Sequence, residues 1–206
     1  MSANEKRSHK TLRLVMLALL TALLLLFEVT GLGYIRTPGL EFTVMQVPVI
    51  IGAIVLGPGA GAVLGTVFGL TSFWQCLSGK SLFGATLLNI SPIGTFLTTV
   101  PTRALMGYLC GLIFWFLWKK MRQGALAHLL ASLAGAMLNT VLFMGTLVLF
   151  FYQTSYIQGF VSGLGAGNAF VFVLLFVGLQ GLLEALISAF ICTVISRALT
   201  SYVLKR

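Results

Sequence analysis

The sequence predicts an all-α membrane protein, with six transmembrane helices in one bundle and both the N- and C-termini in the cytoplasm. Three observations support this fold class: a very apolar composition, long apolar runs, and basic clusters at the ends of those runs. Of the 206 residues, 58% are hydrophobic and 8% are charged, whereas about 25% of a soluble domain is charged. Most of the surface must therefore face lipid. Because the runs are continuous and do not alternate like barrel strands, we expect a single integral membrane domain over residues 1–206.

Six apolar runs approach the roughly 20 residues that a helix needs to cross a bilayer. They cover about 11–30, 42–56, 60–76, 92–118, 124–152 and 168–195. The first exceeds the about 7–15 residues of a signal-peptide core, so we expect it to be a retained helix. The second is short and ends at the turn Gly57-Pro58-Gly59, and Lys119 begins the basic cluster that ends the fourth.

The positions of the basic residues predict the orientation, because cytoplasmic loops of membrane proteins are enriched in Lys and Arg. Six spans place ten of the thirteen Lys and Arg residues on one side. These are Lys6, Arg7, Lys10, Arg13, Lys119, Lys120, Arg122, Arg197, Lys205 and Arg206. An odd number of spans would put the last cluster opposite the first two. Topology thus explains the net charge of +9, and we expect the lipid bilayer, not nucleic acid, as the surrounding partner.

Several polar side chains lie within the predicted spans, where a charge costs roughly 2.5–3.5 kcal/mol on insertion scales. Arg103 and Glu184 lie at similar depths in the fourth and sixth runs, with Asn139 near the middle of the fifth and Gln180 one turn from Glu184. Two interpretations stay open: a structural ion pair between Arg103 and Glu184, or a polar cavity in which Arg103 meets an anionic group of a solute. Glu28 is nearer the outer end of its run, where it can reach the interface.

Polar and aromatic residues on the outer side are further candidates for a binding site. Trp74 and Gln75 end the third run, and Asn89 precedes the fourth. Trp74 has an alternative role, because Trp often anchors a helix at the membrane interface. Asn89 has one as well, because Asn often caps a helix. Both alternatives stay open.

Small residues at spacing four lie on one face of two predicted helices. Ala18 and Ala22 are in the first run, and Gly61, Gly65 and Gly69 are in the third. Such faces allow another helix to approach closely. That helix can belong to the same bundle or to another protein.

Motifs of catalysis and of nucleotide binding are absent. The chain has no Walker A, HExxH or GxSxG motif, contains no Asp, and its three cysteines lack metal-ligand spacing. The sequence therefore predicts a protein that is not an enzyme and has no metal, cofactor or ATPase site of its own. Active transport would take its energy from another subunit.

Two stretches carry a resemblance to a known family. Residues 41–48 (EFTVMQVP) and 49–61 (VIIGAIVLGPGAG) resemble the substrate-binding S components of energy-coupling factor (ECF) vitamin transporters. Residues 68–76 (FGLTSFWQC) and 100–103 (VPTR) are most similar to the pantothenate-type members. The resemblance covers nearly the whole chain.

The resemblance implies a subunit that captures a vitamin on the outer side of a bacterial plasma membrane. Its implied partners are a transmembrane coupling (T) protein and two cytoplasmic ATPases. The loop Gly31–Leu40 would be a lid, and Ala18 and Ala22 would lie on the docking surface for the T protein, with Gly61 and Gly65 beside them.

The candidate substrate-binding residues are Trp74, Gln75, Asn89, Arg103, Asn139, Gln180 and Glu184. Arg103 is the candidate for the single carboxylate of pantothenate, because a guanidinium holds a carboxylate through two parallel hydrogen bonds. Another vitamin such as riboflavin is an alternative. A self-sufficient secondary transporter or channel is a second one, although the chain lacks the evident internal repeats typical of that class.

Overall fold

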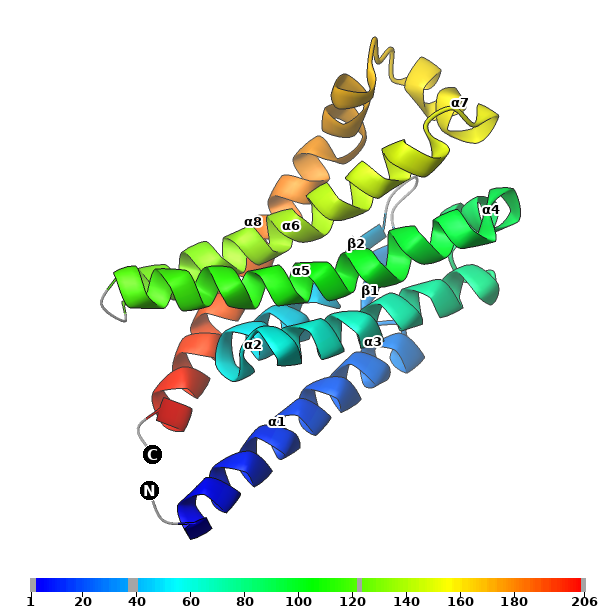
Figure 1. The fold of residues 1–206 in the computed structure, drawn as a ribbon. Helices are drawn as coiled ribbons and strands as arrows, with labels where there is room; N and C mark the ends of the chain where they lie inside the picture. The colour runs from blue at the N-terminus through cyan, green and yellow to red at the C-terminus, as the bar shows by residue number, and fades with distance from the viewer. Residues whose placement is uncertain (1–2, 37–40, 122–123, 205–206) are drawn as a thin grey trace.

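The computed structural model describes residues 3–36, 41–121 and 124–204, which form a bundle of helices with one small hairpin (Figure 1). In chain order the elements are α1 (Ala3–Thr30), β1 (Tyr34–Arg36), β2 (Glu41–Thr43), α2 (Gln46–Leu56), α3 (Pro58–Leu77), α4 (Leu82–Ile90), α5 (Pro92–Lys120), α6 (Ala125–Phe151), α7 (Ser155–Gly163) and α8 (Ala169–Leu204).

Five helical segments are long and apolar enough to cross a membrane. They are Lys10–Thr30, Pro58–Leu77, Pro92–Lys120, Ala125–Phe151 and Gln180–Ser201. A predominantly helical membrane protein is therefore confirmed, whereas six spans and the orientation of the termini stay predictions.

The predicted second span corresponds to α2, which has 11 residues. A helix of this length extends roughly 16 Å, about half the thickness of the hydrocarbon core. Ten of its residues are buried, and it packs against α3, α5, α6 and α8. Its apolar sequence therefore reflects a place at the centre of the bundle.

Short elements at one end of the bundle were not predicted. Ser81 caps the start of α4, because its side chain accepts a hydrogen bond from the Gly84 amide, and Thr154 caps α7 by accepting from the Ile157 amide. These polar residues cap orphan amide groups and so allow short helices in the connecting stretches.

The predicted lid, 31–40, contains strand β1, and β1 pairs antiparallel with β2. Its residues 37–40, including Pro38 and Gly39, lie outside the described residues.

α3 and α5 touch through their backbones. A Cβ atom at Gly61 would meet the carbonyl of Gly107, one at Gly65 would meet the carbonyl of Arg103, and one at Gly69 would lie 2.6 Å from the Cα atom of Val100. Gly61 and Gly65 are buried, so they face into the bundle and not toward a docking partner. The structure therefore shows the other role that was left open for this spacing, which is helix packing within the bundle.

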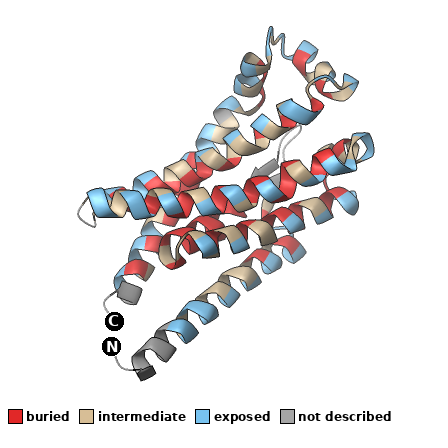
Figure 2. Ribbon diagram, viewed as in Figure 1, coloured by how far each residue is buried: buried red, intermediate tan, exposed pale blue. Residues whose placement is uncertain are grey.

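α1 lies along the side of the bundle against α2 and α3. Its outward face is largely exposed (Figure 2). Ala18 and Ala22 belong to this exposed face, whereas Leu24 and Glu28 are buried. The alanine pair is thus accessible to lipid or to another protein.

Candidate functional site

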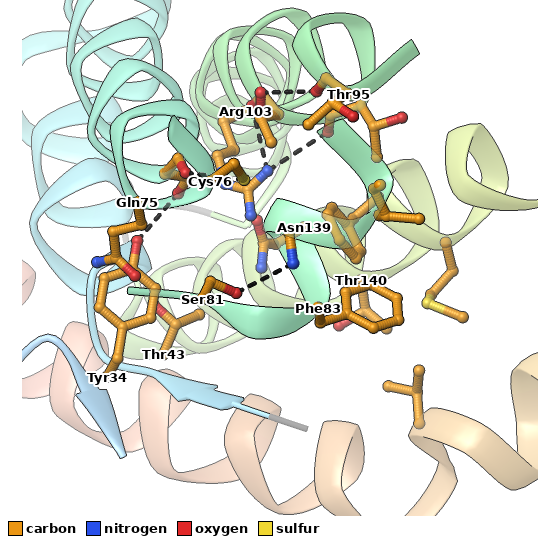
Figure 3. A pocket seen from close by; sticks show the side chains of 18 of the residues that line it. Tyr34, Thr43, Gln75, Cys76, Ser81, Phe83, Thr95, Arg103, Asn139 and Thr140 are labelled. Atoms are coloured by element: carbon orange, nitrogen blue, oxygen red, sulfur yellow. Dashed lines mark hydrogen bonds between the residues drawn. The ribbon is translucent and has the colours of Figure 1, made fainter. Parts of the chain in front are cut away.

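A cavity of about 150 Å³ lies between α3, α4, α5, α6, α8 and the hairpin (Figure 3). One water needs about 10–15 Å³ by the same measure, so this cavity is large enough for a small molecule. Its polar lining consists of Tyr34, Thr43, Ser72, Gln75, Cys76, Ser81, Thr95, Thr98, Thr99, Arg103, Asn139, Thr140, Gln180 and Glu184. Its apolar lining includes Phe83, Leu87, Phe143, Met144 and Val177.

Among the described residues of this lining, Arg103 is the one that carries a positive charge. Its side chain follows α5 toward the start of the helix, the direction that helical side chains take. Nη1 donates to the carbonyls of Thr99 at 3.1 Å and Thr98 at 3.4 Å. The guanidinium lies over the rings of Phe68 and Phe143, 4.7 and 5.1 Å from their centroids. These contacts hold a side chain that is only 9% exposed.

The ion pair between Arg103 and Glu184, one of the two interpretations that the sequence left open, is not formed. Among the residues that the structure describes, the ion pair present joins Lys80 to Glu28. Nε of Arg103 is buried and has no hydrogen-bond partner in the described part of the chain. The guanidinium charge therefore remains available to a ligand in the cavity.

Two further buried polar atoms around the cavity lack hydrogen-bond partners among the described residues. They are Oδ1 of Asn139 and Oγ1 of Thr98, and in Figure 3 Arg103 and Asn139 point toward one another. A buried polar group without a hydrogen bond costs about 1–3 kcal/mol, and most such groups in native proteins are satisfied. Three unpartnered atoms from two helices around one cavity are suited to a polar ligand.

Gln46, which was not among the predicted site residues, hydrogen-bonds to Glu184. Nε2 of Gln46, on α2, donates to Oε1 of Glu184 at 3.1 Å and to Oγ of Ser188 at 2.9 Å. Gln46 is almost completely buried. Gln46 is the one amide in an otherwise apolar stretch, two residues before Pro48. This position could have indicated a buried polar contact.

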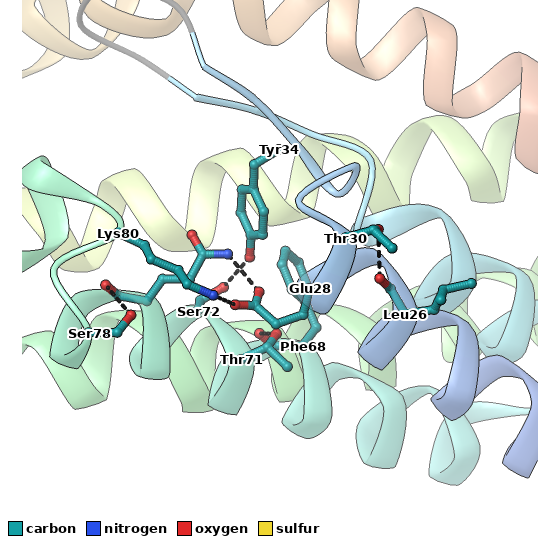
Figure 4. Close-up of polar contacts among 10 residues, drawn as sticks. Leu26, Glu28, Thr30, Tyr34, Phe68, Thr71, Ser72, Ser78 and Lys80 are labelled. Atoms are coloured by element: carbon teal, nitrogen blue, oxygen red, sulfur yellow. Dashed lines mark hydrogen bonds and ion pairs between the residues drawn. The ribbon is translucent and has the colours of Figure 1, made fainter.

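Polar contacts join α1, β1 and α3, with Lys80 after α3, near the hairpin end of the cavity (Figure 4). Nε2 of Gln75 donates to Oε2 of Glu28 at 2.6 Å, and Nζ of Lys80 lies 3.9 Å from Oε1 of the same carboxylate. The hydroxyls of Tyr34 and Ser72 are 2.9 Å apart. Glu28 is thus buried among partners instead of reaching the interface.

Five of the seven predicted substrate-binding residues line the cavity: Gln75, Arg103, Asn139, Gln180 and Glu184. Trp74 does not; it is 59% exposed on the other side of α3, a placement that fits an interface anchor. Asn89 is exposed near the end of α4. It does not cap α5 either, because Ser91 accepts the hydrogen bond from the Gly94 amide.

The threonines of α5 were also missed. Thr95, Thr98 and Thr99 line the cavity, and their spacing with Thr102 places all four on the face of α5 that carries Arg103. This pattern is visible in residues 95–103 of the sequence.

Comparisons with known proteins show the family of this chain. Residues 12–196 match the family model for the ECF transporter, substrate-specific component. The chain is also 33% identical over 172 residues to the pantothenic acid transporter PanT of Lactococcus lactis subsp. cremoris (strain MG1363), a match covering 77% of each chain. This protein therefore belongs to the family of substrate-specific components of ECF transporters.

Proposed function

We propose that this protein is the pantothenate-binding subunit of an ATP-driven ECF importer in a bacterial plasma membrane. The observation that carries the proposal is the buried Arg103 guanidinium, which faces a cavity without a carboxylate partner among the described residues. The similarity to a pantothenic acid transporter supports the same ligand.

The chemistry of pantothenate suits the two kinds of lining. Its carboxylate would accept hydrogen bonds from Arg103, which are stronger than those between neutral groups. Its hydroxyl and amide groups would bind the unpartnered atoms of Asn139 and Thr98 and the carboxylate of Glu184. Its two methyl groups would pack against Phe83 and Leu87 on the apolar wall.

The rest of the proposal concerns topology and partners. Six spans in one domain, with both termini inside, would put the hairpin and the Glu28 contacts on the outside and Lys119 on the inside. The T protein and two ATPases would then supply the energy, and the exposed pair Ala18 and Ala22 would contact the T protein. The protein itself would act as a transporter subunit and not as an enzyme.

Binding measurements on purified protein test the ligand and the role of Arg103. Mass spectrometry of small molecules that copurify in mild detergent should identify pantothenate. Arg103→Gln should weaken pantothenate binding by about 3 kcal/mol, roughly 100-fold, because it removes one partner of a buried charged pair. Lys119→Gln removes an exposed charge far from the cavity and should leave the affinity unchanged. Copurified riboflavin, or full affinity in Arg103→Gln, would overturn the assignment.

Transport assays separate this proposal from a self-sufficient transporter. Vesicles that contain only this protein should not accumulate pantothenate, and uptake should require the T protein, the ATPases and ATP. Uptake by this protein alone, driven by a proton gradient, would favour the secondary-transporter alternative.

A further inference from the structure

A second cavity, of about 220 Å³, lies at the opposite end of the bundle from the Arg103 cavity. Its walls are residues 53–58 at the turn between α2 and α3, the last turns of α5, and Thr200 near the end of α8. The two cavities share no lining residue. The second cavity is therefore a separate feature that binding of a vitamin does not explain.

The interior of this cavity is apolar and aromatic. Phe114, Trp115 and Trp118 contribute three rings from α5, and Trp115 is 55% exposed at the surface of the bundle. The cavity thus communicates with the space that lipid occupies around a membrane protein. The volume of about 220 Å³ accommodates a segment of an extended hydrocarbon chain.

Thr200 places a polar group in this apolar wall. Its side chain is 6% exposed, and its hydroxyl has no hydrogen-bond partner among the described residues. Thr193, two turns earlier on α8, shows the usual alternative: its hydroxyl donates to the carbonyl of Ala189 at 2.5 Å. Helical threonines commonly bond to the preceding turn in this way. The Thr200 hydroxyl is instead available to an acceptor inside the cavity.

Exposed cations contact two of the wall residues from outside. Nζ of Lys119 lies 3.7 Å from the centroid of the Trp115 ring, and the Arg13 guanidinium donates to the carbonyl of Leu56. Among the side chains that the structure describes, the acidic ones, Glu28 and Glu184, belong to the region of the other cavity. Within this described part of the chain, the charges at the mouth of the second cavity are therefore positive.

We propose that this cavity binds one anionic phospholipid. A segment of an acyl chain occupies the aromatic interior, the Thr200 hydroxyl donates to an ester or phosphate oxygen, and Lys119 and Arg13 attract the phosphate. Basic sites between membrane helices favour anionic headgroups for this electrostatic reason. The site is independent of the vitamin and of the proposed function.

Native mass spectrometry of the full-length protein, delipidated in detergent, tests this site. Palmitoyl-oleoyl phosphatidylglycerol should bind as one molecule per chain, at least ten-fold more tightly than the phosphatidylcholine with the same acyl chains. Lys119→Ala should reduce that preference at least three-fold, and Lys119→Arg should restore it. Thr200→Leu, which fills the cavity, should weaken both lipids. Lys80→Ala removes a cation at the opposite end and is the matched control. Unchanged melting temperatures show that the variants are folded.

Several results would overturn the proposal. Equal binding of the two lipids would show that the site does not select an anionic headgroup. An unchanged preference in Lys119→Ala would show that the lipid binds elsewhere. Displacement of the lipid by millimolar inorganic phosphate would show that the headgroup alone suffices. If Lys119→Ala and Thr200→Leu instead abolish assembly with the T protein while lipid binding is unchanged, the cavity belongs to a protein partner.

Discussion

The side chain of Gln75 donates a 2.6 Å hydrogen bond to the buried carboxylate of Glu28 and so joins the end of α3 to the end of α1. Lys80 lies on the other oxygen of the same carboxylate, and Tyr34 and Ser72 connect the hairpin to α3 (Figure 4). Gln75, Tyr34 and Ser72 also line the cavity. A ligand that enters or leaves at this end must therefore disturb these contacts.

Removal of the carboxylate should accelerate release of the ligand. Glu28→Ala leaves Gln75 and Lys80 without their partner, which weakens the contacts at this end of the cavity by about 1–1.5 kcal/mol. We expect dissociation of pantothenate to become roughly five- to tenfold faster in a stopped-flow displacement measurement. Thr30→Ala is the control, because Thr30 is exposed on the same helix end and its hydroxyl donates within α1, to the carbonyl of Leu26. Equal dissociation rates in the two variants would show that Glu28 does not restrain the opening.

The close contact between α3 and α5 should not tolerate a methyl group. Gly65→Ala would place Cβ against the carbonyl of Arg103, and such overpacking costs typically about 1–3 kcal/mol. We expect a lower melting temperature in detergent and weaker pantothenate binding, since Arg103 must shift. In Gly59→Ala, on the same helix, the added Cβ would have no atom of a described neighbour within 4 Å, so this change should be neutral. A Gly65→Ala protein as stable as the Gly59→Ala control would contradict the backbone contact.

Gln46 should affect the site through Glu184. Gln46→Leu is similar in size but removes the hydrogen bonds to Glu184 and Ser188, which leaves a buried carboxylate with fewer partners. We expect a loss of about 1–3 kcal/mol in the free energy of unfolding and a several-fold weaker affinity for pantothenate in titration calorimetry. In Gln158→Leu the lost bond is to the Tyr152 carbonyl near α7, so affinity should be retained. The role in positioning Glu184 fails if both variants bind equally well.

The exposed alanines of α1 should matter for assembly and not for the ligand. Ala18→Trp adds a large side chain to the exposed face, where a closely packed partner helix would clash with it. We expect copurification with the T protein and the ATPases to be lost while pantothenate affinity is unchanged. Met137→Trp introduces the same side chain at an exposed position of α6 and should preserve the complex. If Ala18→Trp still forms intact complexes, this face of α1 is not part of the docking surface.

The membrane class and the position of the site along the bundle axis could be predicted from the sequence. Apolar runs matched α1, α3, α5, α6 and part of α8, because hydrophobicity over about 20 residues is a local property of the chain. Depth is local as well, since each helical residue advances about 1.5 Å. Arg103, Asn139, Gln180 and Glu184 therefore appear around one cavity, as their places in the runs predicted.

Tertiary structure decided the rotation and the partners of each helix. Trp74 and Gln75 are adjacent in sequence, yet one faces outward and the other contacts Glu28, because successive helical residues point about 100° apart. The glycines of α3 pack inside the bundle because the backbone of α5 lies directly against them. Arg103 lies over two aromatic rings without pairing with Glu184, whose carboxylate Gln46 holds. Such choices depend on contacts between residues far apart in the chain, so apolar runs and charge patterns determined the class and the depth, and packing determined the site.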